Sequence, residues 1–378
     1  MISESVTFCP SPWTTLNIDQ TGRVMPCMNS GYELGNLKNS TIQQILQAQP
    51  LRDLRQSIAQ GIWHSACALC KQSEESSGSS GRTVRTVDHE ILASINKDIN
   101  WFGLEHIAVN WSNLCNLTCV YCNPETSTAW QSIKKIPINH IKNEHADLIE
   151  LAQEHGHTVQ GLTLGGGEPL LQKGLVEFLQ CLDKEKVKVL VTTNLSVNLD
   201  TNAVYQELKT WPNVTWMVSF DNVDADKFEY VRDRASWTQF ESNIAQMKTD
   251  QQRVVAHPAY SIYCAFDLVE YYEYCEQHDL NIFWCELTHP WDLDIRRYPL
   301  AVRLQASAVI DQVVARWGTK QKAIDTLLRY QQTLLDNSYL PEPNYTVNGE
   351  RWHRKIETQL NKTKTFSQMW PQLISKAS

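Results

Sequence analysis

Short apolar runs alternate with longer amphipathic segments along the central part of this chain. Runs with the length and composition of β-strands lie at 105–111, 159–164, 186–193, 214–220, 254–263 and 280–287. Segments with the spacing of amphipathic helices lie between them, at 138–155, 174–182, 203–208, 237–248 and 268–278. This alternation is typical of an α/β fold built on parallel strands, and the six runs fit a partial (β/α)6 barrel.

The pattern changes at two places and predicts three regions. Residues 71–82 contain no apolar side chain, so we interpret them as a linker that ends a small α+β region of residues 1–82. After the sixth apolar run, a break at His289-Pro290-Trp291 ends the barrel region of residues 83–298. Residues 299–378 are expected to form a helical appendage, with helical patterns at 303–317, 320–336 and 352–370.

Three cysteines mark the loop that follows the first apolar run. Cys115, Cys119 and Cys122 are spaced as C-x3-C-x2-C. Three thiolates on one short loop can bind three irons of a cubane cluster, which leaves the fourth iron open to a ligand that is not protein. The alternative is that these cysteines are buried hydrophobic residues or zinc ligands.

A glycine-rich loop follows the second apolar run. It reads Thr163-Leu-Gly-Gly-Gly-Glu-Pro169. Glycines allow the backbone to approach a ligand closely, and a carboxylate accepts hydrogen bonds from an ammonium group. The alternative is an ordinary glycine-rich turn between a strand and a helix.

Together the two motifs resemble those of the radical S-adenosylmethionine (radical SAM) superfamily. The resemblance implies that the open iron chelates SAM, and that one electron from the reduced cluster splits the sulfonium to give a 5'-deoxyadenosyl radical. It implies that Tyr121, just before the third cysteine, contacts the adenine. It also implies that Gly166, Gly167 and Glu168 hold the methionyl amino group of SAM.

Polar residues follow the third and fourth apolar runs, where the superfamily contacts SAM. By this resemblance Asn194, Ser219 and Asp221 are candidates for contacts to the ribose hydroxyls or the methionyl end. Arg232 is a candidate partner of the SAM carboxylate, because a guanidinium offers a fork of donors. The alternative for each is a turn, a helix cap or a surface arginine.

A second group of cysteines precedes the barrel region. Cys9, Gly22 and Cys27 are spaced as C-x12-G-x4-C, and the pair Cys67 and Cys70 follows. The spacing resembles the SPASM and twitch domains, which hold auxiliary iron–sulfur clusters but usually follow the barrel. Four thiolates are enough for one fully ligated 4Fe–4S cluster, and a zinc ion needs the same number. The twitch pattern does not require both members of the last pair, so the ligand set stays open.

Four further cysteines lie elsewhere. Cys181 and Cys275 fall within helical patterns and are expected to be small buried hydrophobic residues. Cys264 and Cys285 lie near the ends of the fifth and sixth apolar runs, so they are expected to face the barrel cavity. A substrate-side thiol or hydrogen donor at one of them is the functional alternative.

Composition narrows the function classes only slightly. The chain has 378 residues, 42% hydrophobic content and a formal net charge of −8, so it can bury a large core and offers no basic surface for nucleic acid. It contains no apolar run of membrane length and begins without the pattern of a signal peptide. Eleven cysteines are consistent with a reducing cytoplasm, where thiolates remain available to metals.

These observations predict a radical SAM enzyme that takes a hydrogen atom from a substrate, with one auxiliary cluster that accepts an electron or anchors the substrate. The SPASM resemblance favours a peptide or protein substrate, and a small molecule such as a sugar or amino-acid derivative is the main alternative. An external one-electron reductant such as flavodoxin or ferredoxin is implied. A zinc-stabilised binding protein without catalytic activity is the alternative from another class.

Overall fold

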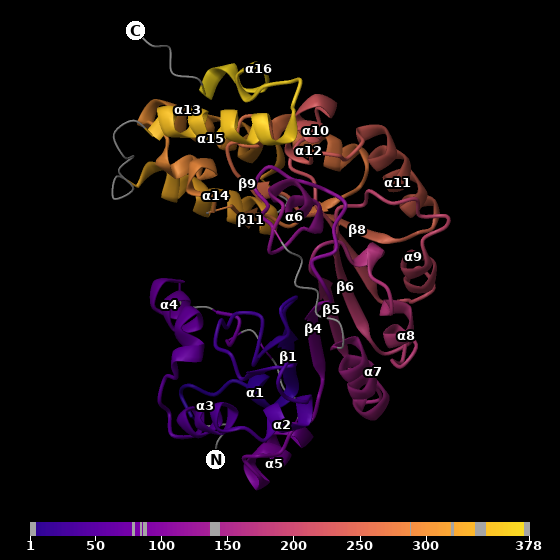
Figure 1. Ribbon diagram of the computed structural model, residues 1–378. Helices are drawn as coiled ribbons and strands as arrows, with labels where there is room; N and C mark the ends of the chain where they lie inside the picture. Colours follow the sequence, from indigo (N-terminus) through magenta and orange to yellow (C-terminus); the bar gives the residue numbers. More distant parts are fainter. Residues whose placement is uncertain are drawn as a thin grey trace. The chain divides into compact units, whose positions relative to one another are not determined.

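The computed structural model describes residues 5–77, 80–83, 85, 89–136, 144–287, 289–318, 321–336 and 345–373 (Figure 1). The chain forms two compact units and passes between them several times. The first unit comprises Met1–Leu114, Ile138–Val191 and Ala203–Val214. The second comprises Cys115–Pro137, Thr192–Asn202 and Thr215–Ser378.

The first unit is built on a mixed sheet with the strand order β3-β2-β1-β4-β5-β6. The strands are β1 (Thr15–Ile18), β2 (Arg23–Met25), β3 (Gly35–Asn36), β4 (His106–Asn110), β5 (Gly161–Gly165) and β6 (Lys188–Thr193), of which β6 ends in the second unit. The first three pair antiparallel, whereas β1, β4, β5 and β6 run parallel. The N-terminal hairpin is therefore an extension of the parallel sheet.

The helices of the first unit are mostly short. They are α1 (Ser11–Thr14), α2 (Ile42–Leu46), α3 (Gln49–Ala59), α4 (Ala68–Ser77), α5 (His89–Lys97), α7 (Glu144–His155), α8 (Leu175–Leu179) and α9 (Ala203–Leu208), with 3-10 turns at Ser65–Cys67 and Pro169–Leu171. Arg55 of α3 is 1% exposed and donates hydrogen bonds to Pro12 O and Asn100 O. This buried guanidinium joins α3 to the segments before β1 and β4, because it donates hydrogen bonds to backbone carbonyls that lie outside the β-sheet.

The second unit continues the parallel strands and carries most of the longer helices. Its strands are β7 (Val214–Val218), which begins in the first unit, β8 (Arg253–Ala256), β9 (Ala259–Tyr260), β10 (Asn281–Ile282) and β11 (Cys285–Glu286). Its helices before residue 290 are α6 (Thr128–Lys134), α10 (Ala225–Val231), α11 (Trp237–Thr249) and α12 (Leu268–Gln277). β7, β8 and β10 run parallel, and β9 pairs with β11 as a separate parallel ladder.

All six predicted strands are present, and the α/β fold class is confirmed. Two of them are broken, since 254–263 becomes β8 and β9 and 280–287 becomes β10 and β11. Pro258 lies at the first break, where its missing N–H cannot join a ladder. The predicted helix 138–155 is observed as α7, and its first six positions lie outside the described residues.

The first part of the predicted linker is helical, and its described last residues, 80–82, are not. Residues 71–77 belong to α4, and residues 78 and 79 lie outside the described part of the chain. Lys, Gln and Glu are good helix formers, so a segment without apolar residues can still form a helix. Arg82 then returns to α4, where its guanidinium pairs with Glu74. The N-terminal region is joined to the parallel sheet by the pairing of β1 with β4.

The C-terminal region is helical, as predicted. It contains α13 (Leu300–Trp317), α14 (Gln321–Leu335), α15 (Tyr345–Leu360) and α16 (Phe366–Met369), with 3-10 turns at Trp291–Leu293, Ile295–Arg297 and Pro371–Leu373. Figure 1 shows α13, α14 and α15 in orange and yellow, and α13 packs against α14. Tyr263 OH lies 2.9 Å from His353 Nε2, and the His353 ring stacks on Phe366 at 3.6 Å. These buried aromatic contacts pack the appendage onto the loop that follows β9.

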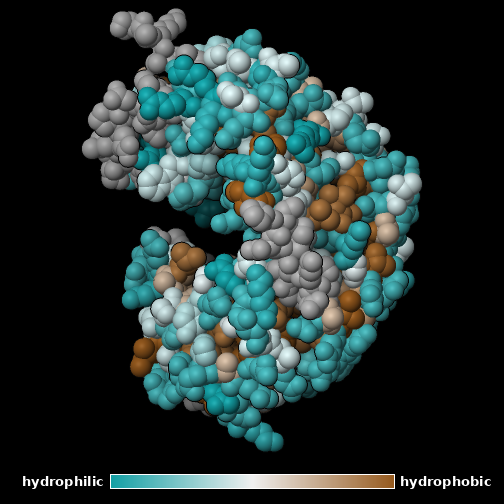
Figure 2. Space-filling model, viewed as in Figure 1, coloured by the Kyte–Doolittle hydropathy of each residue, from teal (hydrophilic) through white to brown (hydrophobic). Residues whose placement is uncertain are grey.

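The surface in view is mostly hydrophilic, with apolar residues scattered in small groups (Figure 2). Within the described residues, no helix has both the length and the apolar character needed to cross a membrane.

Candidate active site

The beginning of α6 fixes the backbone of the cysteine loop in the second unit. Thr128 Oγ1 accepts a hydrogen bond from Cys115 N at 3.2 Å and donates one to Cys115 O at 3.1 Å. Ser127, the N-cap of α6, donates from its hydroxyl to Leu117 O at 2.7 Å. Trp130 Nε1 donates to Cys119 O at 3.0 Å. The loop thus obtains its backbone partners from the helix that follows it.

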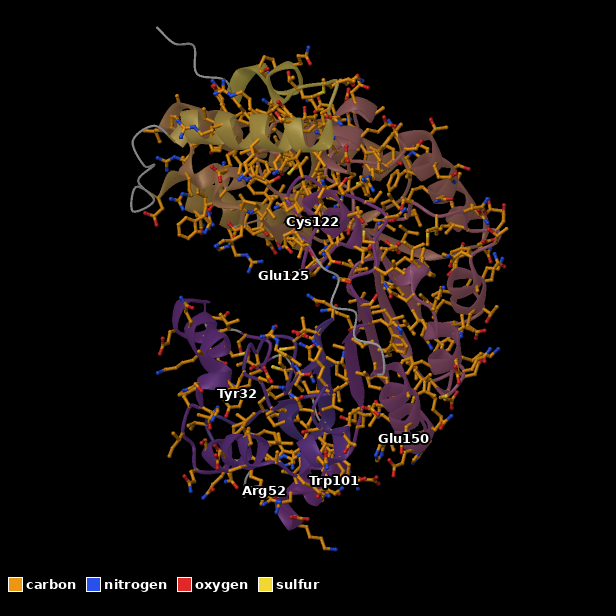
Figure 3. The ribbon with its side chains drawn as sticks, viewed as in Figure 1. Tyr32, Arg52, Trp101, Cys122, Glu125 and Glu150 are labelled. Atoms are coloured by element: carbon orange, nitrogen blue, oxygen red, sulfur yellow. The ribbon has the colours of Figure 1, made fainter. Side chains whose placement is uncertain are left out.

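The end of α10 holds the other side of the same loop. Thr118 N donates to Asp233 O at 3.1 Å, and Val120 N donates to Val231 O at 2.9 Å. The Thr118 hydroxyl also donates to the Asp233 carboxylate. Figure 3 labels Cys122 on this loop and Glu125 in the turn that leads to α6. Contacts from α6 and from the segment at and just beyond the end of α10 therefore fix the loop between Cys115 and Val120.

The three thiols of this loop lie close enough to influence one another electrostatically. Burial raises the pKa of Cys119, and the neighbouring Cys122 and Cys115 raise it further, whereas Arg232 opposes the shift. Cys119 is 7% exposed, while Cys115 and Cys122 are half-buried. The donor set suits an iron–sulfur cluster by its chemistry, because cysteine thiolates are the usual ligands of such clusters. Loading a cluster would displace the protons that burial favours.

Tyr121, Asp221 and Arg232 form one connected group beside the loop. Tyr121 OH donates to Asp221 Oδ2 at 2.8 Å, and Arg232 Nε donates to the same oxygen at 2.9 Å. Asp221 Oδ1 accepts from Ala259 N at 2.9 Å. The guanidinium also lies 5.4 Å from the centroid of the Tyr121 ring. Both acidic oxygens are bonded within the protein, so the carboxylate is satisfied without a ligand.

The contacts to SAM that were predicted for Arg232 and Asp221 stay predictions. Within the protein, the Arg232 guanidinium pairs with Asp221 in a contact where the side chains are 8% and 1% exposed, and Asp221 also accepts a hydrogen bond from Tyr121 OH. The physical reason for the ion pair is burial, since a charge removed from water needs an opposite charge nearby.

The other two strand-end candidates lie in different surroundings. Asn194 is 8% exposed, and its amide nitrogen lies 3.7 Å from Cys115 Sγ. Ser219 is half-buried at the end of β7, and its N–H donates to Thr193 O at 2.9 Å. Asn194 thus lies next to Cys115, a predicted cluster ligand. Ser219 lies at the end of its strand, as predicted from the sequence.

The glycine loop of the first unit packs tightly against the segment that follows β4. Gly167 N donates to Ser112 O at 2.8 Å, and Glu168 N donates to Leu114 O at 2.8 Å. A Cβ on Gly167 would lie 2.4 Å from Leu114 O, and Gly166 has a φ of +108°. Only glycine fits these two positions without strain. The loop therefore supports Leu114, the residue directly before Cys115 in the sequence.

Glu168 caps the turn that follows the glycine loop. Its side chain is 0% exposed, and Oε1 accepts a hydrogen bond from Leu170 N at 3.1 Å at the start of the 3-10 turn Pro169–Leu171. Its predicted contact to the ammonium of SAM stays a prediction. The turn that was the structural alternative is present, and it fixes the direction of the carboxylate.

The four N-terminal cysteines lie together in the first unit. Burial raises the pKa of Cys67 to about 12, and the charges of Cys9, Cys27 and Cys70 add to this shift. Burial also raises the pKa of Cys27 to about 11, with contributions from Cys9 and Cys70. Four thiolates would saturate one 4Fe–4S cluster, and the ligand set stays a prediction.

Two arginines accompany this cysteine group. The charge of Arg82 lowers the pKa of Cys67, and the charge of Arg85 lowers that of Cys27, although burial dominates both. Arg82 is held by the Glu74 carboxylate and by Phe8 O at 3.0 Å, while Arg85 donates to Thr15 Oγ1 at 2.8 Å. Positive charge beside four thiolates suits an anionic cluster. The sequence analysis missed both arginines, because nothing in their spacing links them to the cysteines.

The remaining cysteines differ in exposure. Cys264 and Cys275 are 1% and 2% exposed, so the expectation that Cys264 faces a cavity is wrong, and Cys275 is buried as predicted. Cys181 is only half-buried, which contradicts the expected burial in a helix. Cys285 is half-buried, and burial raises its pKa to about 11 with a further contribution from Asp221. Of the four, Cys285 is the thiol that remains partly accessible near the Tyr121 group.

Residues that hold the cysteine loop were also missed. Thr118, Asp233, Ser127 and Thr128 carry its contacts. The Ser127-Thr128 pair at the start of an apolar helical pattern was a detectable N-cap signal. Asp233 gave no signal, because its partner is more than a hundred positions away in sequence, at |i−j| = 115.

Two family models match the chain. The model of the radical SAM superfamily matches residues 109–256, which include the cysteine loop and the glycine loop. Residues 109–256 of the chain form a radical SAM domain. A model described as an iron–sulfur cluster-binding domain, SPASM, matches residues 9–71, which include all four N-terminal cysteines. This radical SAM chain therefore has a 4Fe–4S cluster and SAM as its cofactors and, on the N-terminal side of its barrel, a domain for an additional iron–sulfur cluster.

Similar curated proteins match only part of this radical SAM chain. The GTP 3',8-cyclase of Listeria welshimeri is 28% identical over 137 residues, which cover 34% of this chain and 38% of that protein. The 7-carboxy-7-deazaguanine synthase of Clostridium acetobutylicum is 34% identical over 102 residues, which cover 27% of this chain and 41% of that protein. The chain thus spans about two fifths of the length of these relatives.

Similar solved structures include Streptococcus suis SuiB bound to S-adenosylmethionine, with a TM-score of 0.44 and 15% identity over 80% of this chain and 69% of that one. Native anSMEcpe with bound AdoMet has a TM-score of 0.39 and 15% identity over 49% of this chain and 52% of that one.

Proposed function

We propose that this protein cleaves SAM reductively at a cluster on Cys115, Cys119 and Cys122, and that the resulting 5'-deoxyadenosyl radical abstracts a hydrogen atom from a peptide or protein substrate. A one-electron reductant such as flavodoxin or ferredoxin would supply the electron. The observation that carries this proposal is the cysteine loop, whose three thiols influence one another electrostatically and whose backbone is held by α6 and Asp233. A cluster ligated by three thiolates provides an open iron to which SAM can bind.

The protein's own residues position SAM and exclude water from it. The buried Glu168 carboxylate accepts the methionyl ammonium, since its direction is set by the Leu170 cap. Tyr121 presents its ring to the adenine while its hydroxyl is held by Asp221. Fixed groups of this kind reduce the cost of orienting the reacting atoms. Ser219 remains a proposed ribose contact at the end of β7.

The N-terminal cysteines hold an auxiliary cluster that carries electrons and does not anchor the substrate. Four thiols would leave no open iron for a substrate group.

Among the described residues, one edge of β10 and of β11 pairs with no other strand, and this edge supports an extended peptide as the substrate. Phe283 N and Cys285 N donate to Ala256 O and Pro258 O, so the alternate N–H groups of Trp284 and Glu286 point to the other side. A cavity of about 910 Å³ lies there, between these strands and α14. A peptide could add to this edge as a further strand, since edge strands expose their hydrogen-bonding groups.

A small-molecule substrate is the second candidate function. It is favoured by the similarity to GTP 3',8-cyclases and to a 7-carboxy-7-deazaguanine synthase. A peptide substrate would pair with the strand edge beside β11, whereas a small-molecule substrate would not.

The test begins with anaerobically purified protein and the Cys115→Ala, Cys119→Ala, Cys122→Ala variant. The wild-type protein should contain roughly eight irons, as two cubanes require, and should form 5'-deoxyadenosine from SAM when reduced. The variant should lose about half of the iron and all SAM cleavage. Unchanged 5'-deoxyadenosine formation would refute the proposal, and zinc in place of iron would indicate the binding-protein alternative.

Substrate class requires a separate measurement. Mass spectrometry of peptides and small molecules incubated with SAM, reductant and protein would detect a mass change or deuterium exchange at a substrate carbon. Modification of a peptide but of no small molecule supports the first candidate, and the reverse result supports the second.

A further inference from the structure

The side-chain amide of Asn194 lies against the sulfur of Cys115. Asn194 directly follows β6 in the second unit, and its Nδ2 is 3.7 Å from Cys115 Sγ. The same nitrogen is 3.4 Å from Asn116 Oδ1. Asn194 is 8% exposed, so these contacts are shielded from water. A donor at this distance is within the range of a hydrogen bond to sulfur.

The neighbouring Ser196 determines which end of the amide faces the sulfur. Asn194 Oδ1 accepts from Ser196 N at 3.0 Å and from Ser196 Oγ at 2.6 Å. A backbone N–H can only donate, so the atom that faces it must be the amide oxygen. The NH2 group is then directed towards Cys115. Ser196 Oγ also accepts from Asn116 Nδ2 at 2.9 Å, which connects the three side chains.

Both hydrogens of the amide have acceptors within the protein. One is directed to Cys115 Sγ and the other to Asn116 Oδ1. The amide can therefore make its full set of donor contacts without SAM. This geometry differs from the ribose contact that the sequence resemblance implied for Asn194.

We propose that Asn194 is a positioning residue that donates an N–H···S hydrogen bond to the Cys115 thiolate and thereby sets the reduction potential of the cluster that SAM cleavage requires. This inference rests on the proposed function, since it places a cluster at Cys115. A donor beside a cluster sulfur withdraws negative charge from it, and reduction adds negative charge to the cluster. Hydrogen bonds to the sulfurs therefore favour the reduced form and raise the potential.

The experiment is an EPR-monitored redox titration of the Cys115 cluster, made in a Cys9→Ala, Cys27→Ala background so that a single cluster is observed. In that background Asn194→Ala should retain the iron and shift the midpoint potential to a more negative value. Ser196→Ala should shift it in the same direction by less, because the amide remains but loses one of its two fixing contacts. Resonance Raman spectra should show a changed Fe–S(Cys) stretching frequency in both variants.

Asn198→Ala is the matched control. Asn198 lies in the same loop, is exposed, and accepts only a local hydrogen bond from Asp200 N at 3.0 Å among those described. It should leave the potential unchanged.

An unchanged potential in Asn194→Ala, with weaker SAM binding, would overturn the inference and restore the ribose contact. If Asn194→Ala fails to retain iron, the midpoint potential of Ser196→Ala becomes the test. An unchanged midpoint potential in Ser196→Ala would also overturn the inference. Failure of the proposed function has a different signature, because the parent background would then hold no cluster to titrate.

Discussion

Lys362 and Asp233 join the C-terminal region to the cysteine loop. Lys362 Nζ, just beyond α15, lies 2.7 Å from Asp233 Oδ1, and their side chains are 7% and 18% exposed. The same carboxylate accepts the hydroxyl of Thr118, and the Asp233 carbonyl accepts Thr118 N. A residue of the C-terminal appendage therefore neutralises the acid that holds the loop between Cys115 and Cys119.

Replacing Lys362 by methionine should loosen this loop. The change leaves a mostly buried carboxylate without its cation, which we expect to lower the free energy of unfolding by about 3 kcal/mol. Iron at the cysteine loop should be lost faster to a chelator, because Asp233 would turn towards water and draw away from Thr118. Chemical denaturation and iron release under anaerobic conditions measure the two effects.

Lys364→Met is the matched control for this prediction. Lys364 pairs with Asp226 nearby, but the two side chains are 48% and 54% exposed. An exposed pair contributes little, so stability should change by less than about 1 kcal/mol and iron release should not change. Equal effects of the two substitutions would show that Lys362 has no special connection to the loop.

Glu168 can be tested with two substitutions that separate its cap from its charge. Glu168→Gln retains an oxygen that can accept from Leu170 N, whereas Glu168→Ala removes it. A hydrogen bond to a charged group contributes about 1.5–3 kcal/mol, so Gln should weaken SAM binding roughly ten- to a hundredfold. Ala should in addition destabilise the fold by about 1 kcal/mol.

Equilibrium binding of SAM and thermal unfolding distinguish these effects. Cluster content should hardly change in Glu168→Gln. Wild-type SAM affinity in that variant would assign Glu168 to the turn alone.

The N-terminal cysteines can be separated from the catalytic loop. Cys9→Ala, Cys27→Ala should remove roughly the other half of the iron, because two of the four thiols that share a site are lost. SAM cleavage without substrate should persist, and product formation should fail for lack of an electron acceptor. Iron and sulfide assays beside mass spectrometry of product check this. Full iron content, or loss of zinc, would contradict an auxiliary cluster.

His106 should make stability depend on pH. Burial and the charge of Arg85 lower the pKa of His106 to about 4, and its Nε2 lies 3.1 Å from Thr163 Oγ1. Below about pH 6.5 the unfolded chain binds a proton that the folded chain does not. Stability contributed by the neutral ring is therefore present above about pH 6.5 and decreases as pH falls towards about 4. The loss between about pH 7 and pH 5 should approach about 2 kcal/mol.

The measurement compares His106→Gln with the wild-type protein by urea unfolding at both pH values. Gln does not titrate, so the variant should lose about 2 kcal/mol less than the wild type over this interval. Parallel pH dependence in the two proteins would show that His106 does not contribute.

The local pattern of the chain was sufficient to predict the six strands, the helical C-terminal region and the two cysteine groups. These features depend on residues close together in sequence, such as the three cysteines within eight positions that can bind one cluster. The prediction of a linker at 71–77 was wrong for a related reason. It relied on the lack of apolar residues, whereas the helix-forming residues of this segment extend α4.

Only the tertiary structure decided what the polar residues around these motifs contact. Asp221 meets Arg232 and Tyr121, Asn194 meets Cys115, and Asp233 meets Lys362 across separations of up to |i−j| = 129. Sequence spacing does not predict such pairs. The packing of the strands and helices determines which charged side chains are buried next to each other. The cysteine loop could therefore be predicted from its residue types, whereas the roles of the side chains that surround it follow from burial and from the need to pair each buried charge.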